Sequence, residues 1–148
     1  MPTGRQADQM IGADLEGFII PSAAVPVATY HVKSNQDGSY SLGAGAPNRS
    51  DVLYSAGKYL DLTIDITNAN GGTLTVTIVG WDPASGKQFT ILASAGLVAN
   101  ATTVLKVGPA LTAAANLVAN DFIPFEWSVQ VVVATATMTF SLGGQQMP

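Results

Sequence analysis

The stretch YLDLTIDIT (residues 59–67) decides the fold class of this chain. Within it, aspartate or threonine alternates with four apolar residues, Leu60, Leu62, Ile64 and Ile66. Successive side chains of a β-strand point to opposite faces, so this period of two predicts a strand with one buried and one hydrated face. The turn NANGG (68–72) and the alternating stretch TLTVTI (73–78) come next and predict an antiparallel partner strand.

Further alternating stretches lie on both sides of this hairpin. They occupy residues 28–42 (a hairpin that turns at 35–38), 88–93, 102–107, 125–133 and 137–142. Seven or eight short strands with turn signals between them are typical of an all-β protein, an antiparallel β-sandwich that is either jelly-roll or Ig-like. The order of the strands in the sheets stays open.

Two segments of this region depart from the strand pattern. The alanine-rich residues 111–120 predict one or two turns of helix, because alanine has the highest helix propensity. The final residues 143–148, GGQQMP, are predicted to form a tail. Trp127 is in phase with Val129 and Val131, so it is expected in the core.

Residues 1–26 differ from the rest, because apolar residues are interrupted there by glycine and proline. Pro21 and Pro26 have no backbone N–H and do not suit regular strand pairing. The segment is either a buried connector or an extended arm that orders against another subunit. We favour the arm, because the strand pattern begins only afterwards. We therefore predict an N-terminal arm, residues 1–26, and a single sandwich domain, residues 27–148. The candidate subunit contacts are the apolar residues of the arm: Met10, Ile11, Leu15, Phe18, Ile19, Ile20 and Val25.

The composition predicts one domain with few surface charges. The chain has 148 residues, of which 47% are hydrophobic and 11% are charged, well below the usual quarter. Charged surfaces keep monomers apart, so a surface rich in threonine, serine and asparagine favours close contact with neighbours. We expect a homo-oligomer.

Charge and hydropathy argue against nucleic acid and membranes as partners. The net charge is −4 and the six lysines and arginines are scattered, whereas phosphate-backbone binding needs a clustered positive field. The apolar runs are far shorter than the ~20 residues that span a bilayer. The N-terminus lacks the apolar region of a signal peptide, so synthesis and use without export are expected.

No motif in the sequence predicts catalysis, and we expect a non-enzyme without cofactor or metal. His31 is the single histidine and there is no cysteine, so the chain lacks the set of residues that a zinc site or a cysteine–histidine catalytic pair requires. Asp61 and Asp65 share one strand face about 13 Å apart, too far for a glycosidase pair. The segment 80–87, GWDPASGK, has the wrong spacing for a phosphate-binding loop.

Trp81 is the candidate exposed aromatic residue. It is in phase with the threonines at 73, 75 and 77 and stands beside a turn. An exposed tryptophan can stack on a sugar, so this residue alone favours a carbohydrate-binding adhesion module.

An ordered series of motifs gives the chain a resemblance to a known group. The series is DLTIDITN (61–68), TVTI (75–78), DPASGK (82–87), TVLKVGP (103–109), LTAAAN (111–116) and IP (123–124). In this order, the region 60–142 resembles small structural proteins of tailed bacteriophages, many of them encoded near the major capsid protein.

The resemblance implies a virion protein made in the host cytoplasm. It implies a decoration, or cement, protein on the exterior of an icosahedral capsid, with the major capsid protein as partner and a trimer as the favoured oligomer. Such a protein stabilises contacts between capsomers by burying surface across several subunits at once. A tail or head–tail component is the alternative within virions. The first 58 residues carry none of the resemblance.

Overall fold

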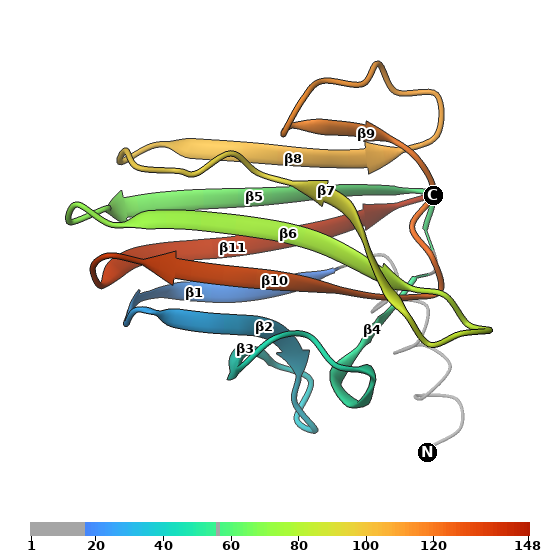
Figure 1. Cartoon of the computed structure of the whole chain (residues 1–148), viewed down its shortest axis with the longest axis horizontal. Helices are drawn as coiled ribbons and strands as arrows, with labels where there is room; N and C mark the ends of the chain where they lie inside the picture. The colour runs from blue at the N-terminus through green and yellow to red at the C-terminus, as the bar shows by residue number, and fades with distance from the viewer. Residues whose placement is uncertain (1–16, 56) are drawn as a thin grey trace.

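The chain folds into two packed β-sheets (Figure 1), and the computed structural model describes residues 17–55 and 57–148. The first sheet has the order β1-β11-β5-β8-β9. Its strands are β1 (Phe18–Val25), β5 (Tyr59–Asn68), β8 (Thr102–Gly108), β9 (Val118–Asn120) and β11 (Met138–Met147).

The second sheet has the order β3-β2-β10-β6-β7, with a short strand β4 paired to β10. Its strands are β2 (Ala28–Ser34), β3 (Tyr40–Ala44), β4 (Leu53–Tyr54), β6 (Thr73–Trp81), β7 (Gln88–Ala93) and β10 (Glu126–Ala134). One 3-10 turn, η1 (Arg49–Asp51), precedes β4. Among the described residues there is no helix with the length and apolar character that a membrane crossing requires.

The strand order identifies the sandwich as a jelly roll. β1 and β2 pair with β11 and β10 respectively, and β5 and β6 pair with β8 and β7. The chain is thus a long antiparallel ribbon rolled so that its two arms form opposite sheets. In an immunoglobulin fold the first two strands share a sheet, whereas β1 and β2 lie in different sheets here. The predicted all-β sandwich is confirmed, and the topology decides between its two forms.

The core lies between the sheets and follows the predicted alternation. Leu60, Leu62, Ile64 and Ile66 of β5 are all buried, as is Trp127 of β10. The chain turns between β5 and β6 through Asn70 and Gly71, both at positive φ, as the NANGG segment predicts. The predicted pairing of these two strands is wrong, because β5 lies in the first sheet and β6 in the second. The buried residues of β5, together with Met138, Phe140 and Leu142 of β11, form one continuous core with those of the second sheet.

The predicted arm is wrong for residues 18–25, which form the edge strand β1. Phe18 pairs with Gly144 and Val25 with Met138 along β11. The pairing register shifts between Ile20 and Ala23, so Pro21 falls at a bulge of an edge strand, where a missing N–H is tolerated. The sandwich therefore begins at Phe18, nine residues before the predicted boundary.

Two further expectations are wrong. Residues 111–120 form no helix: the segment turns at Asn116, with φ of 62°, and continues into β9 parallel to β8. Residues 143–147 are no tail, since β11 runs through Met147. Gly143 and Gly144 hid this strand because they carry no side chain to show the alternation, and the missing side chain of Gly144 leaves room for the Phe18 ring.

Candidate functional site

The predicted contact residues separate into three groups. Phe18, Ile20 and Val25 are buried in the core, so they are not available to another subunit. Ile19 points outward from the same strand and is 73% exposed. Met10, Ile11 and Leu15 lie outside the described residues. Of the predicted contact residues that the structure describes, only Ile19 is therefore accessible to a partner.

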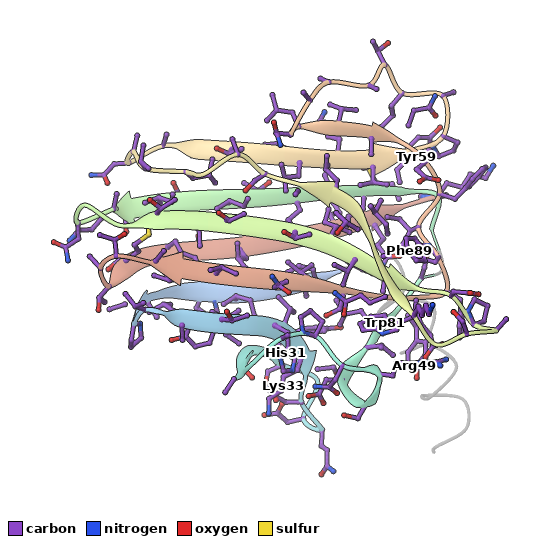
Figure 2. All side chains as sticks on the ribbon, viewed as in Figure 1. His31, Lys33, Arg49, Tyr59, Trp81 and Phe89 are labelled. Atoms are coloured by element: carbon purple, nitrogen blue, oxygen red, sulfur yellow. The ribbon has the colours of Figure 1, made fainter. Side chains whose placement is uncertain are left out.

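Trp81 is buried rather than exposed, with 5% of its surface accessible. It does lie on the outward face of its strand, as predicted, and Figure 2 places it where β6 meets the following turn. However, it packs with Val79 and Val52 in a small cluster outside the main core. Val52 belongs to the segment between β3 and β4, which covers this part of the sheet. A cover supplied by a distant segment gives no signal in the local sequence.

His31 anchors the same covering segment to the sheet. Its Nε2 lies 2.9 Å from Oδ2 of Asp51, and its Nδ1 lies 3.0 Å from the carbonyl oxygen of Gly45. The ring lies against Gly43, where a Cβ would stand 2.8 Å from it. With both nitrogens engaged, this histidine serves as a structural clamp.

An exposed aromatic cluster lies at the end of the sandwich where β6 ends and β10 begins. We call it the aromatic end, and it consists of Tyr54, Phe89, Phe122 and Phe125. Their exposed fractions are 56%, 44%, 66% and 68% respectively. Figures 1 and 2 show β4, the start of β7 with Phe89, and the segment leading into β10 at this one end of the molecule.

Short distances connect three members of the aromatic end, Tyr54, Phe125 and Phe89. The rings of Tyr54 and Phe125 lie 5.0 Å apart, tilted by 46°. Phe89 and Pro124 both lie against Gly80, within 3.0 Å of where its Cβ would stand. Pro124 therefore connects Phe89 to the Tyr54–Phe125 pair.

One ion pair lies beside the Tyr54–Phe125 part of the aromatic end. Arg49 forms an ion pair with Glu126, whose backbone pairs with that of Tyr54. The hydrogen bond from the guanidinium to this carboxylate raises the pKa of Arg49 above its ordinary value. At Tyr54 the border of the aromatic end is therefore a closed ion pair, and Asp121 adjoins Phe122.

The sequence patterns missed the aromatic end for a local reason. Phe125 is in phase with Trp127, so it was predicted inside the strand, yet β10 begins only at Glu126 and Phe125 is exposed. Phe122 lies in the segment that precedes this strand. Two phenylalanines flanking Ile123 and Pro124 outside a strand are the signal that could have indicated a surface role.

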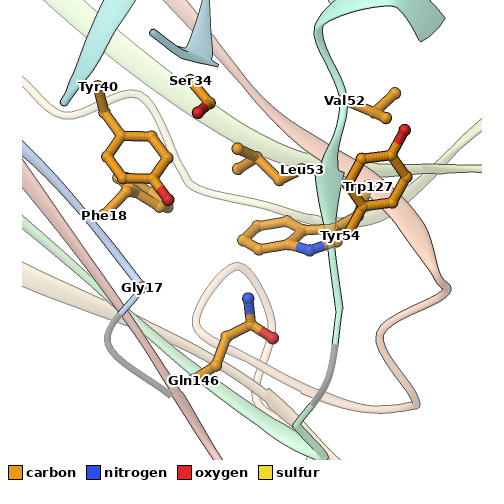
Figure 3. Close-up of a pocket in the computed structure, with 9 residues that line it drawn as sticks. All are labelled: Gly17, Phe18, Ser34, Tyr40, Val52, Leu53, Tyr54, Trp127 and Gln146. Atoms are coloured by element: carbon orange, nitrogen blue, oxygen red, sulfur yellow. The ribbon is translucent and has the colours of Figure 1, made fainter. Parts of the chain in front are cut away.

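A pocket of about 220 Å³ opens beside the aromatic end, between β1, β4 and β10 (Figure 3). The indole of Trp127 forms one wall, and its Nε1 is buried with no hydrogen-bond partner in the part of the chain that the structure describes. Phe18 and Leu53 form other parts of the wall, and exposed Ser34 and Tyr54 lie at the rim. Within residues 17–55 and 57–148, no group of histidines and acidic residues is placed to hold a metal ion.

No protein-family model and no curated protein sequence matches this chain. Among solved structures, the chain is similar to the crystal structure of the Yersinia pseudotuberculosis-derived mitogen, at 11% sequence identity and a TM-score of 0.45. The match covers 88% of this chain and 86% of the other. At this identity and TM-score the likeness carries no argument.

Proposed function

We propose that this protein is a virion structural component, a decoration protein that binds the exterior of a phage capsid through its aromatic end. The exposed cluster of Tyr54, Phe89, Phe122 and Phe125 is the observation that carries the proposal. The resemblance of region 60–142 to phage structural proteins supplies the kind of partner, the major capsid protein.

The size and chemistry of the aromatic end suit a protein partner. An aromatic side chain buries roughly 150–250 Å² in full, so four half-exposed rings present on the order of 300–500 Å². That area equals the largest apolar patch of a typical monomer, and such patches are commonly functional. Aromatic residues also dominate the centres of protein interfaces. The cluster has the area of an interface core, around which a standard contact of about 800 Å² per partner would form.

The low charge of the chain supports the same proposal. With 11% charged residues and the ion pair of Arg49 and Glu126 closed, binding at the aromatic end rests on apolar burial. Apolar contacts are not screened by salt, whereas ionic steering fades beyond the Debye length. We therefore expect capsid binding to persist at high ionic strength.

The burial of Trp81 removes the feature that favoured a carbohydrate-binding adhesion module. A tail or head–tail component would use the same kind of surface. Copy number separates this role from decoration: a decoration protein is present in proportion to the major capsid protein, and a tail part in a few copies per particle. Mass spectrometry of purified particles measures this ratio.

Binding of point variants to capsids that lack the protein tests the aromatic end. Deleting residues 1–26 is unsuitable, because it removes β1 from the core. We expect Phe125→Ser and Tyr54→Ser each to weaken co-sedimentation with the capsid at least about thirtyfold, the effect of losing an aromatic hot spot. Val98→Ser is the matched control, since Val98 is 63% exposed in the loop between β7 and β8 at the opposite end.

The outcome that contradicts the proposal is equally direct. If the Val98→Ser variant loses binding and the Phe125→Ser variant retains it, the contact surface lies at the other end. The trimer implied by the resemblance is measured separately, as the mass of the free protein by light scattering.

A further inference from the structure

We infer that a groove along the open side of the sandwich, between the edge strands β1 and β3, binds an extended and uncharged segment of the capsid partner. The inference rests on the proposed function, which supplies the partner, and it adds a second contact to the aromatic end. We call this feature the edge groove. It consists of the pocket beside Trp127 and two further hollows, of about 370 and 400 Å³, that follow it along β1.

The edge groove runs without a break from the aromatic end along β1. Its first hollow includes Tyr54 of the aromatic end and shares Gly17 and Phe18 with the second hollow. The second hollow shares Pro21 with the third, which reaches Pro26, just past the end of β1. At roughly 3.3 Å per residue, the eight residues of β1 span about 26 Å. The groove therefore has the length of an extended chain segment.

The space between the two sheets is open at this side of the molecule. β1 and β3 are the outermost strands of their sheets, and Figure 1 shows them on the same side of the sandwich. Ala23 pairs with Phe140 of β11, whose side chain is buried in the core, so Ala23 also points between the sheets. Ala23 is nevertheless exposed. A segment that lay in the groove would therefore cover the inner face of the sandwich at its open side.

The backbone of β3 offers hydrogen bonds to an added strand. The N–H of Gly45 donates to the carbonyl oxygen of Thr29, and hydrogen-bonded residue pairs alternate along two antiparallel strands. The N–H and carbonyl groups of Leu42 and Ala44 consequently point away from β2, toward the open side. β1 is less suitable as a pairing edge, because Pro21 has no N–H. We therefore expect the partner segment to pair with β3 as an additional strand.

The lining of the edge groove determines the side chains of the segment. None of the described residues that line the three hollows carries a charge at neutral pH. A charged side chain buried there would lose its hydration without an opposite charge to replace it, which is strongly unfavourable. Hydroxyl and amide groups of Ser34, Tyr54 and Gln146 line the first hollow, whereas the third is mainly apolar. The segment therefore carries uncharged polar side chains near the aromatic end and apolar side chains toward Pro26.

Ala23→Trp and Ser22→Trp form a matched pair that tests the edge groove. Both residues are exposed on β1, but only Ala23 lines the groove. The larger side chain at position 23 would fill the third hollow from its open side. We expect Ala23→Trp to weaken co-sedimentation with the capsid at least about tenfold, as for a lost interface contact, and Ser22→Trp to bind like the unaltered protein. Urea unfolding of both variants checks that the core is intact.

Equal binding of the two variants would overturn the edge groove as a contact. The proposed function would stand in that case if Phe125→Ser still weakened binding, and it would fall as well if Phe125→Ser bound normally. A photo-reactive side chain in place of Ala24, which is exposed on the rim of the groove, identifies the occupant in capsid-bound protein. Cross-links to the major capsid protein are expected. Cross-links to a second copy of this chain or to its own residues 1–16, or no cross-link at all, would overturn the assigned occupant.

Discussion

Replacing Phe18 with alanine tests the finding that β1 belongs to the sandwich. Phe18 is 3% exposed, its ring centroid lies 5.9 Å from that of Tyr40 and 6.4 Å from that of Trp127, and it packs on Gly144. Truncating a buried phenylalanine to alanine costs about 3–5 kcal/mol, because transfer free energy is lost and a cavity remains. Against a typical unfolding free energy of 5–15 kcal/mol, this is a large loss.

The neighbouring Ile19 provides a control of similar hydrophobicity in the same strand. Because it is 73% exposed, Ile19→Ala should change the free energy of unfolding by no more than about 0.5 kcal/mol. Urea unfolding followed by tryptophan fluorescence measures both variants. With a slope near 2 kcal/mol per molar, the midpoint of Phe18→Ala should fall by about 2 M, and that of Ile19→Ala should stay nearly unchanged. Equal shifts would refute the placement of β1, since an unpaired arm has no buried face.

Three further predictions concern other parts of the sandwich. Gly108→Ala should destabilise the fold by about 1–3 kcal/mol, because the new Cβ would stand 2.1 Å from a tyrosine ring carbon of β5. Gly143→Ala is the control and should be tolerated, because nothing lies near the position of its Cβ. Thermal unfolding compares the two variants. A double-mutant cycle of His31→Ala and Asp51→Ala should show a coupling of about 1 kcal/mol or more, and additive effects would argue against the clamp. Hydrogen bonds from a serine hydroxyl and a backbone N–H lower the pKa of Asp82 below its ordinary 3.8. The contribution of this carboxylate to stability is therefore present above pH 3.8 and is lost as the pH falls through the folded-state pKa. Carboxyl resonances followed from pH 6 to 2 should show a titration midpoint below 3.8 for Asp82, and an unshifted midpoint would contradict this.

The strands that could be predicted are those whose own residues alternate between apolar and polar. The strand character of β5 and β6 needs no distant information, because apolar residues at every second position and an Asn-Gly turn specify two strands and the turn between them. The pairing of these strands was not predictable in this way, since β5 pairs with β11 and β8 in one sheet and β6 with β10 and β7 in the other. β1 and the end of β11 were missed because proline and glycine interrupt or erase the alternation there. Their strand character arises from each other: Phe18 fills the space that Gly144 leaves.

The candidate surfaces were less predictable than the fold. Phase correctly placed Trp81 on the outward face of β6, but burial on that face depends on Val52, which arrives from a segment far away along the chain. The opposite happened at Phe125, whose phase predicted burial although it lies just before the strand begins. The position of a residue in the period-two pattern indicates which face of the strand its side chain occupies. It does not indicate whether another segment covers that face.

By itself, the sequence determined the class of this protein: an all-β chain with two-faced strands, a nearly uncharged surface and a core made of every second residue. These properties follow from local periodicity and composition, which each stretch of the chain carries within itself. Only the tertiary structure decided between the jelly-roll and immunoglobulin orders, buried the first described strand, covered Trp81 and gathered the aromatic end and the Trp127 pocket. Those outcomes depend on which distant segments meet, and pairing energies summed over the whole chain select them.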